Sequence, residues 1–262
     1  LNIIVKRMGI DDKFILSDKN NINTQKVKID TNKKVVSKTL YNKAFLKPLC
    51  NIDLEYFKVY SISIKTLNLF KISRLIYIET KKTINDKETL SYLRFNIKEV
   101  AYHYKTIEII DKSVKDTGFK VHIPIDKKKR FLSYCSSTSI YYNPCLFVKM
   151  DNISENYLIF TKSMKDSMCL YEIGYVAFST TSETIDVKSI GIFIKFIIKR
   201  INTLYNRYFK IVLMFDNDDT GRRFTVQFDK YLFEVLNIKS IIVFLETKDI
   251  SDLIRDKGIK YA

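Results

Sequence analysis

The chain has 262 residues, 46% hydrophobic and 13% aromatic, so it can bury a sizeable core and is not a disordered tail. Six glycines and three prolines exclude linker-rich and collagen-like classes, and no apolar run reaches the roughly 18–20 residues of a membrane span, so no membrane association is expected. The net charge is +16.

The positive charge is concentrated in one half of the chain. Residues 1–150 carry 29 Lys and Arg against 14 Asp and Glu, a net +15, whereas residues 151–262 carry 16 against 15, a net +1. An AT-rich coding sequence explains abundant lysine but not a balanced second half. A basic half beside a neutral one indicates a polyanionic partner, most often nucleic acid.

The basic half is predicted to contain an arm followed by a mixed α+β subdomain. Residues 1–38 are rich in Asn, Lys and Asp without periodicity, and indicate an arm or linker. Residues 39–150 form the subdomain, with a short helix pair within 54–75 that begins at Ser61 or Ser63 as N-cap. β-branched and aromatic runs then predict a mainly antiparallel sheet, with strands in 73–80, 89–97, 101–110, 118–126 and 130–134.

Residues 151–262 alternate between apolar strands and helices. This α/β pattern predicts a largely parallel, Rossmann-like sheet with helices on both faces. The expected strands lie in 157–160, 175–180, 210–215 and 240–246. The expected helices lie in 163–174, 186–207 and 219–237.

Acidic side chains follow three of these strands. Asp166 comes after the first, Asp216 and Asp218 close the third, and Asp249 and Asp252 follow the fourth. Functional residues of such sheets lie at the carboxyl ends of the strands, and converging carboxylates need a hard cation, so the set favours Mg²⁺ or Mn²⁺ over zinc. The alternative is that each carboxylate only caps a helix.

The segment "KIVLMFDNDDTG" indicates how its acidic side chains are oriented. Alternation along a strand sends Asp216 and Asp218 toward the same side, while Asn217 points away. Asp219 begins the next helix, where a negative charge is favourable, and Gly221 permits a tight turn.

Taken in order, "LIFTKSMKDSMCLYEIGYVAF", "KIVLMFDNDDTGRR" and "ETKDISDLI" resemble a Toprim domain, in the version of DnaG-type and phage primases. The upstream segments "LEYFKVYSISIKTLNLFKI" and "GFKVHIPIDKKKRFLSYCSST" are similar to the start and the basic segment of a primase catalytic core. The resemblance covers roughly residues 50–256. It implies a template-binding subdomain at 39–150 and a catalytic Toprim domain at 151–262.

The resemblance also implies a function. It indicates a DNA-directed RNA polymerase that makes short RNA primers on single-stranded DNA from NTPs, by Mg²⁺-dependent nucleotidyl transfer. Asp216, Asp218 and Asp249 or Asp252 would hold the metal, and Asp166 would orient it. The implied setting is the replication fork in the cytoplasm of a bacterial, phage-infected or virus-infected cell, with a replicative helicase as partner.

The sequence departs from the family pattern in the first motif. Lys162 stands where Toprim domains usually have Glu, and Ser163 where they have Gly. A lysine cannot bind Mg²⁺, but it can neutralise the carboxylates or contact a phosphate. We count Lys162 among the catalytic candidates and Glu183 as a substitute metal ligand. The alternative for Glu183 is an ordinary solvent-facing position before a helix.

Basic residues outside the acidic motifs are candidate nucleic-acid contacts. Lys127, Lys128, Lys129 and Arg130 form a run that either follows the template backbone or is an ordinary solvated turn. The alternation in "RFLSY" favours Phe131 as a core residue over a template contact.

A second pair of basic residues, Arg222 and Arg223, begins the helix beside the acidic site. Cations disfavour a helix N-terminus, so these arginines indicate a phosphate or carboxylate partner.

Two other functions stay open. A non-catalytic Toprim-like DNA-binding module is favoured by Lys162, and a Toprim nuclease or topoisomerase-like protein would use similar metals. The upstream segments favour the primase. Four dispersed cysteines and two histidines argue against a zinc site. Because the sequence shows no zinc module or helicase segment, we expect separate proteins for these tasks or a longer parent chain.

Overall fold

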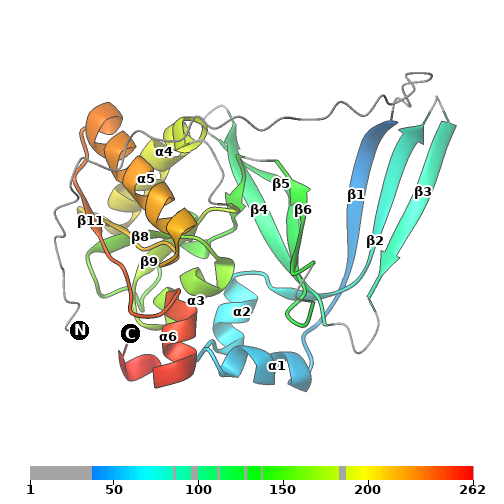
Figure 1. Ribbon diagram of the computed structural model, residues 1–262, viewed down its shortest axis with the longest axis horizontal. Helices are drawn as coiled ribbons and strands as arrows, with labels where there is room; N and C mark the ends of the chain where they lie inside the picture. Colours follow the sequence, from blue (N-terminus) through cyan, green and yellow to red (C-terminus); the bar gives the residue numbers. More distant parts are fainter. Residues whose placement is uncertain are drawn as a thin grey trace, which may run out of the picture.

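The computed structural model describes residues 37–84, 87–95, 100–110, 113–126, 129–136, 138–182 and 187–261. These residues form two sheets, one antiparallel and one parallel, with helices around the parallel one (Figure 1). Within the described ranges, no helix is both long enough and apolar enough to cross a membrane.

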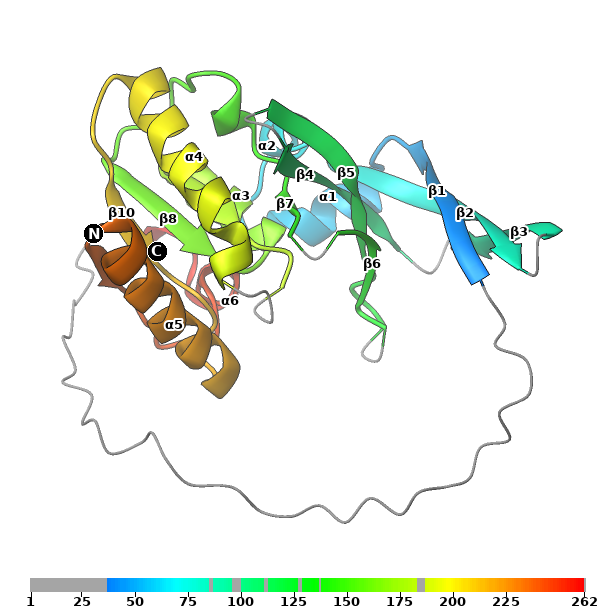
Figure 2. The ribbon, with the colours of Figure 1, turned by 90° about the horizontal axis from the view of Figure 1, so that it is seen from above.

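The antiparallel sheet has seven strands. Its main path runs β1-β2-β4-β5-β6, with β3 paired to β2 and β7 paired to β4. The strands are β1 (Ser37–Lys47), β2 (Ser73–Ile84), β3 (Lys87–Arg94), β4 (Tyr102–Ile110), β5 (Ser113–His122), β6 (Phe131–Cys135) and β7 (Ile140–Tyr141). Strands β1, β2 and β3 extend away from the rest of the molecule as a separate blade (Figures 1 and 2).

The predicted strands of this half are present, but β1 was not predicted. Its sequence, SKTLYNKAFLK, alternates polar and apolar residues weakly and is rich in Lys and Asn, so it read partly as linker. The strand is held by antiparallel pairing along β2, from Ser37 opposite Ile84 to Lys47 opposite Arg74. Tertiary pairing therefore overrides a weak local preference here.

Between β1 and β2 lie the two short helices predicted from the sequence, α1 (Asn51–Lys58) and α2 (Ile64–Leu69). Ser63 is the N-cap of α2, because its hydroxyl accepts a hydrogen bond from the Thr66 amide at 3.2 Å. Of the two predicted caps, Ser63 is thus the correct one. Ser61 instead adopts a left-handed backbone with φ of 55°.

A buried ion pair joins α1 to the sheet. The Arg74 guanidinium lies 3.2 Å from Asp53 Oδ1, and both side chains are buried. Asp53 also accepts hydrogen bonds from the Cys50 amide at 2.8 Å and the Tyr102 hydroxyl at 3.3 Å. These bonds satisfy a carboxylate that water does not reach, and they fix α1 against β2 and β4.

The parallel sheet has the order β11-β10-β8-β9. Its strands are β8 (Tyr157–Thr161), β9 (Val176–Ser179), β10 (Lys210–Leu213) and β11 (Ser240–Ile242), all paired in parallel. β8, β9 and β10 are buried nearly throughout, as expected for strands covered on both faces. The predicted strand–helix alternation is confirmed.

Four helices cover the parallel sheet. They are α3 (Met164–Glu172), α4 (Val187–Tyr205), α5 (Asp219–Leu236) and α6 (Ile250–Lys257). Helices α4 and α5 pack side by side over one face, and α3 and α6 lie together on the other (Figure 1). The buried face of α5 has apolar residues four positions apart, at Phe224, Phe228 and Leu232. Gly191 lets α4 approach α5, since a Cβ there would meet the Tyr231 ring.

The two sheets share one hydrophobic core. It includes Tyr102 and Tyr104 from β4 together with Phe160 and Phe178 from β8 and β9. The Asn143 side-chain amide also donates a hydrogen bond to the Ala177 carbonyl at 2.5 Å. The antiparallel sheet is therefore fixed against the β9 edge of the parallel sheet, and the carboxyl ends of β8 and β10 face it.

Candidate active site

Three carboxylates converge at the carboxyl edge of the parallel sheet. Asp166 lies in the first turn of α3, Asp216 follows β10, and Asp249 precedes α6. One carboxylate oxygen from each residue lies within 4.8 Å of the other two, although the three residues span 84 positions of the sequence. Asp166 and Asp216 are buried. The structure thus brings together one residue from each predicted acidic motif.

Helix capping fixes the positions of three of the predicted acidic residues. Asp218 is the N-cap of α5 and accepts a hydrogen bond from the Gly221 amide at 3.0 Å. Asp249 is the N-cap of α6 and accepts from the Asp252 amide at 2.7 Å. Asp166 forms a capping box with Ser163 at the start of α3. Capping and convergence, which the sequence presented as alternatives, are both present, and three helix N-termini stabilise the negative charge.

Two lysines compensate the buried charge of Asp216. The ammonium groups of Lys162 and Lys248 lie 2.7 Å and 3.2 Å from the same oxygen, Oδ2 of Asp216. Lys248 also lies 3.1 Å from Asp218 Oδ2. Asp216 and Asp218 therefore share a partner, as side chains on the same side of the chain can, but Asp218 lies outside the cluster of Asp166, Asp216 and Asp249. Asn217 points away and donates to the Leu245 carbonyl at 2.6 Å.

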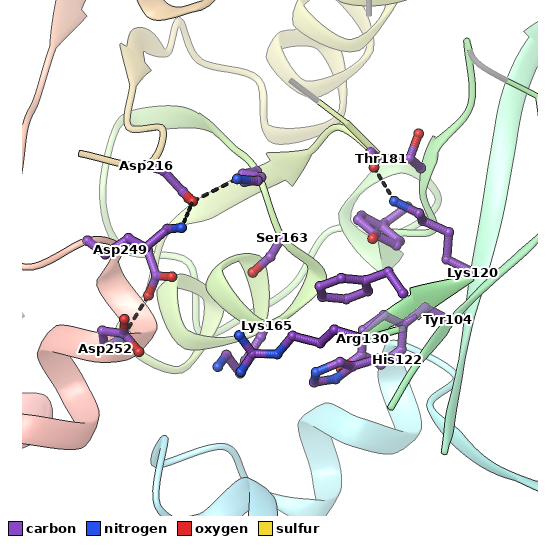
Figure 3. A pocket seen from close by; sticks show the side chains of 14 residues that line it. Tyr104, Lys120, His122, Arg130, Ser163, Lys165, Thr181, Asp216, Asp249 and Asp252 are labelled. Atoms are coloured by element: carbon purple, nitrogen blue, oxygen red, sulfur yellow. Dashed lines mark hydrogen bonds and ion pairs between the residues drawn. The ribbon is translucent and has the colours of Figure 1, made fainter. Parts of the chain in front are cut away.

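The carboxylates of Asp216, Asp249 and Asp252 lie in one wall of a pocket of about 180 Å³ between the two sheets, and Asp166 is buried outside the described lining. In Figure 3 the labelled aspartates lie on the left, and Tyr104, Lys120 and His122 lie on the right. The described lining residues are Tyr104, Lys120, His122, Arg130, Phe131, Tyr141, Lys162, Ser163, Lys165, Thr181, Asp216, Lys248, Asp249 and Asp252. An acidic wall thus faces a basic and aromatic wall.

The register of the antiparallel sheet builds the aromatic wall. Lys120 and His122 point to the same side of β5, Tyr104 is opposite Lys120 on β4, and Phe131 is opposite His122 on β6. The Phe131 ring stacks on His122 with centroids 4.8 Å apart and an interplanar angle of 14°. Lys120 lies 5.5 Å from the Phe131 ring centroid and donates a hydrogen bond to the Thr181 carbonyl.

Phe131 corrects a prediction from the sequence. Its side chain was expected in the core, but it is 45% exposed and faces the pocket. The alternation in "RFLSY" is real. However, the apolar side of β6 packs through Leu132 and Tyr134 on the opposite face, against a second, smaller hydrophobic cluster that includes Phe119 and Val121 of β5. A pattern of period two does not say which face is buried.

Burial keeps the pocket's ring groups neutral. Burial lowers the pKa of His122 to about 3, helped by the nearby Lys165 and Arg130 charges. Burial likewise raises the pKa of Tyr104 well above its ordinary value. The Tyr104 hydroxyl and His122 Nδ1 form a hydrogen bond of 2.9 Å, whose direction depends on the tautomer of the imidazole. The wall offers a flat, uncharged surface beside cationic groups.

Burial also raises the pKa of Asp166, and the neighbouring Asp249 charge adds to this effect. For Asp218, the hydrogen bond from the Gly221 amide lowers the pKa. Burial opposes the charged form of Lys248, but hydrogen bonds to Asp218 and Asp216 outweigh it and raise the pKa of the ammonium. The site thus carries charge that a cation would stabilise further.

The remaining residues predicted for the site differ in whether they line the pocket. Asp252 lines the pocket and is ion-paired with Arg255 at 2.7 Å. Arg130 lines the pocket, whereas Lys129 is exposed beside Asp126 and outside the lining set. Lys127, Lys128 and Glu183 lie outside the described residues.

Arg222 and Arg223 lie on the exposed first turn of α5, outside the described lining of the pocket. Arg222 donates to the Asn217 side-chain oxygen at 2.8 Å, and Arg223 donates to the Asp219 carbonyl at 3.1 Å. The cations at this helix start therefore have acceptors within the chain itself.

Sequence reasoning missed several residues of the pocket, namely Tyr104, Lys120, His122, Tyr141, Lys165, Thr181 and Lys248. Lys120 and His122 had a usable signal, because they alternate with Phe119 and Val121 on a predicted strand and so share the face opposite the apolar one. Lys248 stands inside the acidic segment "ETKDISD", so its position among carboxylates could be read from the sequence.

The donor set fits a hard divalent cation. Its oxygens belong only to carboxylates, which Mg²⁺ and Mn²⁺ prefer. One oxygen each from Asp166, Asp216 and Asp249 lies within 4.8 Å of the other two, so the three carboxylates can converge on a single ion.

Comparison with known proteins identifies the fold. No family model matches the sequence, and no curated protein matches it. A structure of the Aquifex aeolicus primase, comprising its zinc-binding and RNA polymerase domains, is 15% identical with a TM-score of 0.52. The match covers 81% of this chain and 54% of that one. The chain therefore has the fold of a primase core, which confirms the resemblance seen in the sequence.

Two phage structures were also found. One is the primase fragment of the bacteriophage T7 primase-helicase protein, 15% identical with a TM-score of 0.44, covering 77% of this chain and 69% of that one. The other is a complex of the T7 lagging-strand DNA polymerase with primase domains bound to an RNA/DNA hybrid and dTTP. It is 15% identical with a TM-score of 0.45, covering 83% of this chain and 88% of that one.

Proposed function

We propose that this chain is the catalytic core of a DNA primase, which makes short RNA primers on single-stranded DNA. One observation carries the proposal: Asp216 and Asp249, which cluster with the buried Asp166, face a basic and aromatic wall across the pocket. A nucleoside triphosphate bound with a divalent cation needs both walls, one for the metal and one for the phosphates and base. The primase fold supports the same assignment.

Residues 151–262 are assigned to the Toprim class and to the catalytic role. Support comes from the four parallel strands and from acidic residues at corresponding strand ends. Residues 39–150 are assigned to template binding, because this half carries most of the net charge. The first strand of this half, β1, begins at Ser37. The arm predicted at residues 1–38 lies outside the described part as far as residue 36, and its last two residues, Ser37 and Lys38, belong to β1.

Within the pocket, each wall has a separate task. Lys120, Lys165 and Arg130 provide positive charge for the triphosphate, and Arg130 offers a planar donor set that suits phosphate oxygens. The Phe131 face, backed by His122, provides a stacking surface for a base. Asp166, Asp216 and Asp249 are the residues that would hold Mg²⁺ or Mn²⁺.

The reaction is attack of a primer 3′-hydroxyl on the α-phosphate, which forms a phosphodiester and releases pyrophosphate. When bound, the metal supplies Lewis-acid polarisation of the phosphate and charge for the attacking and leaving oxygens. The chain itself contributes position and electrostatics. The capped aspartates are fixed by helix starts, and the opposite wall is fixed by the sheet register.

The expected partners are single-stranded DNA, NTPs and a replicative helicase at a replication fork, in the cytoplasm of a bacterial or virus-infected cell. The test is incubation of the purified chain with single-stranded DNA, labelled NTPs and Mg²⁺ or Mn²⁺. We expect short RNA products that require both template and metal. DNA binding without products would support the non-catalytic module, which the Lys162–Asp216 ion pair favours. Cleavage of the DNA would support a nuclease.

A variant of the aromatic wall tests nucleotide binding. Phe131→Ala removes the stacking surface, and stacking is worth about 1–3 kcal/mol per base, so we expect nucleotide affinity to fall roughly 5- to 150-fold. Equilibrium binding of a fluorescent NTP measures this. Phe147→Ala is the matched control, because Phe147 is 40% exposed and stacked on Tyr142 outside the pocket lining. Equal losses in both variants would contradict the assignment.

A further inference from the structure

Two ammonium groups occupy the metal side of the pocket. Lys162 follows β8 and Lys248 precedes α6, yet both approach Oδ2 of Asp216, at 2.7 Å and 3.2 Å. The Asp216 side chain is 4% exposed, whereas the lysine side chains are 33% and 52% exposed. The buried carboxylate is therefore neutralised from the solvent side by this chain's own cations.

Backbone contacts hold Lys248 in this position. The Asn217 amide donates to the Lys248 carbonyl at 2.7 Å, and the Asn217 side chain donates to the Leu245 carbonyl at 2.6 Å. The segment before α6 is thus tied to the residue that follows Asp216. The Lys248 backbone is thereby held beside Asp216, which places its ammonium within reach of Asp216 and Asp218.

The charges around the cluster can be counted. Three carboxylates belong to it, those of Asp166, Asp216 and Asp249. Asp218 lies outside the cluster but shares Lys248 with Asp216, so four carboxylates are counted. Asp252 is paired with Arg255 and is left out. Lys162 and Lys248 form ion pairs with two of the four. A bound cation favours the ionised form of all four, including Asp166, and two negative charges then remain, which is the charge that one divalent cation neutralises.

We infer that Lys162 and Lys248 take the place of a second divalent cation, so that this site binds one Mg²⁺ or Mn²⁺. The inference rests on the proposed function for the choice of metal. It adds that the positive charge beside the reacting phosphates comes partly from lysine. Lysine carries a compact charge with rotatable donors, which suits the contact with either carboxylate or phosphate oxygens.

The stoichiometry of Mn²⁺ binding tests the inference directly. The purified full chain is titrated with Mn²⁺ without nucleotide or DNA, and the electron paramagnetic resonance signal of free Mn²⁺ gives the number bound. We expect one Mn²⁺ per wild-type chain. In Lys162→Glu, which exchanges one positive for one negative charge, we expect two. Either two or none in the wild type would overturn the inference.

A matched control separates position from overall charge. Lys230→Glu makes the same charge change on α5, where Lys230 is exposed, pairs with Glu234 and lies outside the described pocket lining. We expect this variant to keep one Mn²⁺. A second Mn²⁺ in Lys230→Glu would show that overall charge, not the place of Lys162, sets the number bound, and would overturn the inference.

A milder variant guards against misfolding of Lys162→Glu. Lys162→Met removes one ammonium that competes for Asp216, so we expect one Mn²⁺ bound roughly tenfold more tightly. Unchanged or weaker affinity would count against the inference. Because the readout is metal binding, one bound Mn²⁺ without primer synthesis would contradict only the proposed function, and two bound with synthesis only the inference.

Discussion

Primer synthesis is expected to fall about 10²- to 10³-fold when Asp216 is replaced by Asn, the loss typical of removing one preorganised electrostatic group from an active site. Asp216 is central because it is buried, belongs to the carboxylate cluster, and is the partner of both lysines. The rate of NTP incorporation on single-stranded DNA measures the effect, with folding checked by circular dichroism.

The fold should tolerate this change. Asparagine has nearly the same shape, and the lysines that lose their partner are 33% and 52% exposed, so water can solvate them. Asp219→Asn is the matched control, since Asp219 lies three residues away on the exposed start of α5 and outside the cluster. We expect it to retain nearly full activity. Full activity in Asp216→Asn would show that the metal-binding carboxylates lie elsewhere.

The largest expected loss of stability comes from Arg74→Met. This change leaves the Asp53 carboxylate buried beside the Cys50 amide and the Tyr102 hydroxyl without its counter-charge. Breaking a buried ion pair from one side costs about 3–5 kcal/mol, so we expect the free energy of unfolding to fall by that amount. Urea denaturation followed by circular dichroism measures it.

Two further variants separate the cause. Asp53→Asn combined with Arg74→Met removes both charges, and we expect it to recover much of the lost stability. Lys58→Met breaks the exposed pair with Glu55, and we expect a change of at most about 1 kcal/mol. A double variant as unstable as Arg74→Met would show that packing, not the unpaired charge, causes the loss.

The sequence predicted the parallel half better than the antiparallel half, for a physical reason. Strands buried on both faces appear as continuous apolar runs, so β8, β9 and β10 were recognisable. β1 was missed because its pairing with β2 stabilises a segment whose own residues do not strongly favour a strand.

Within the site, the convergence of Asp166, Asp216 and Asp249 was predictable from strand ends, and their roles stay predictions. Of the two lysines that pair with Asp216, only one was singled out from the sequence. Lys162 was noticed as a departure from a family pattern, but its partner depends on a distance between segments that no local pattern encodes. The aromatic wall was missed for the same reason, because Phe131 and His122 meet through cross-strand register.

The hydrophobic core shared by the two sheets has a consequence for cooperativity. The residues that cover α3 and β9 come from α2 and β7, as Phe70 against Tyr171 and Ile140 paired with Thr180 show. A separate fragment of residues 151–261 would expose this surface to water. We therefore expect the two halves to unfold in a single thermal transition, so that both walls of the pocket are lost together. Neither half alone is then expected to bind nucleotide.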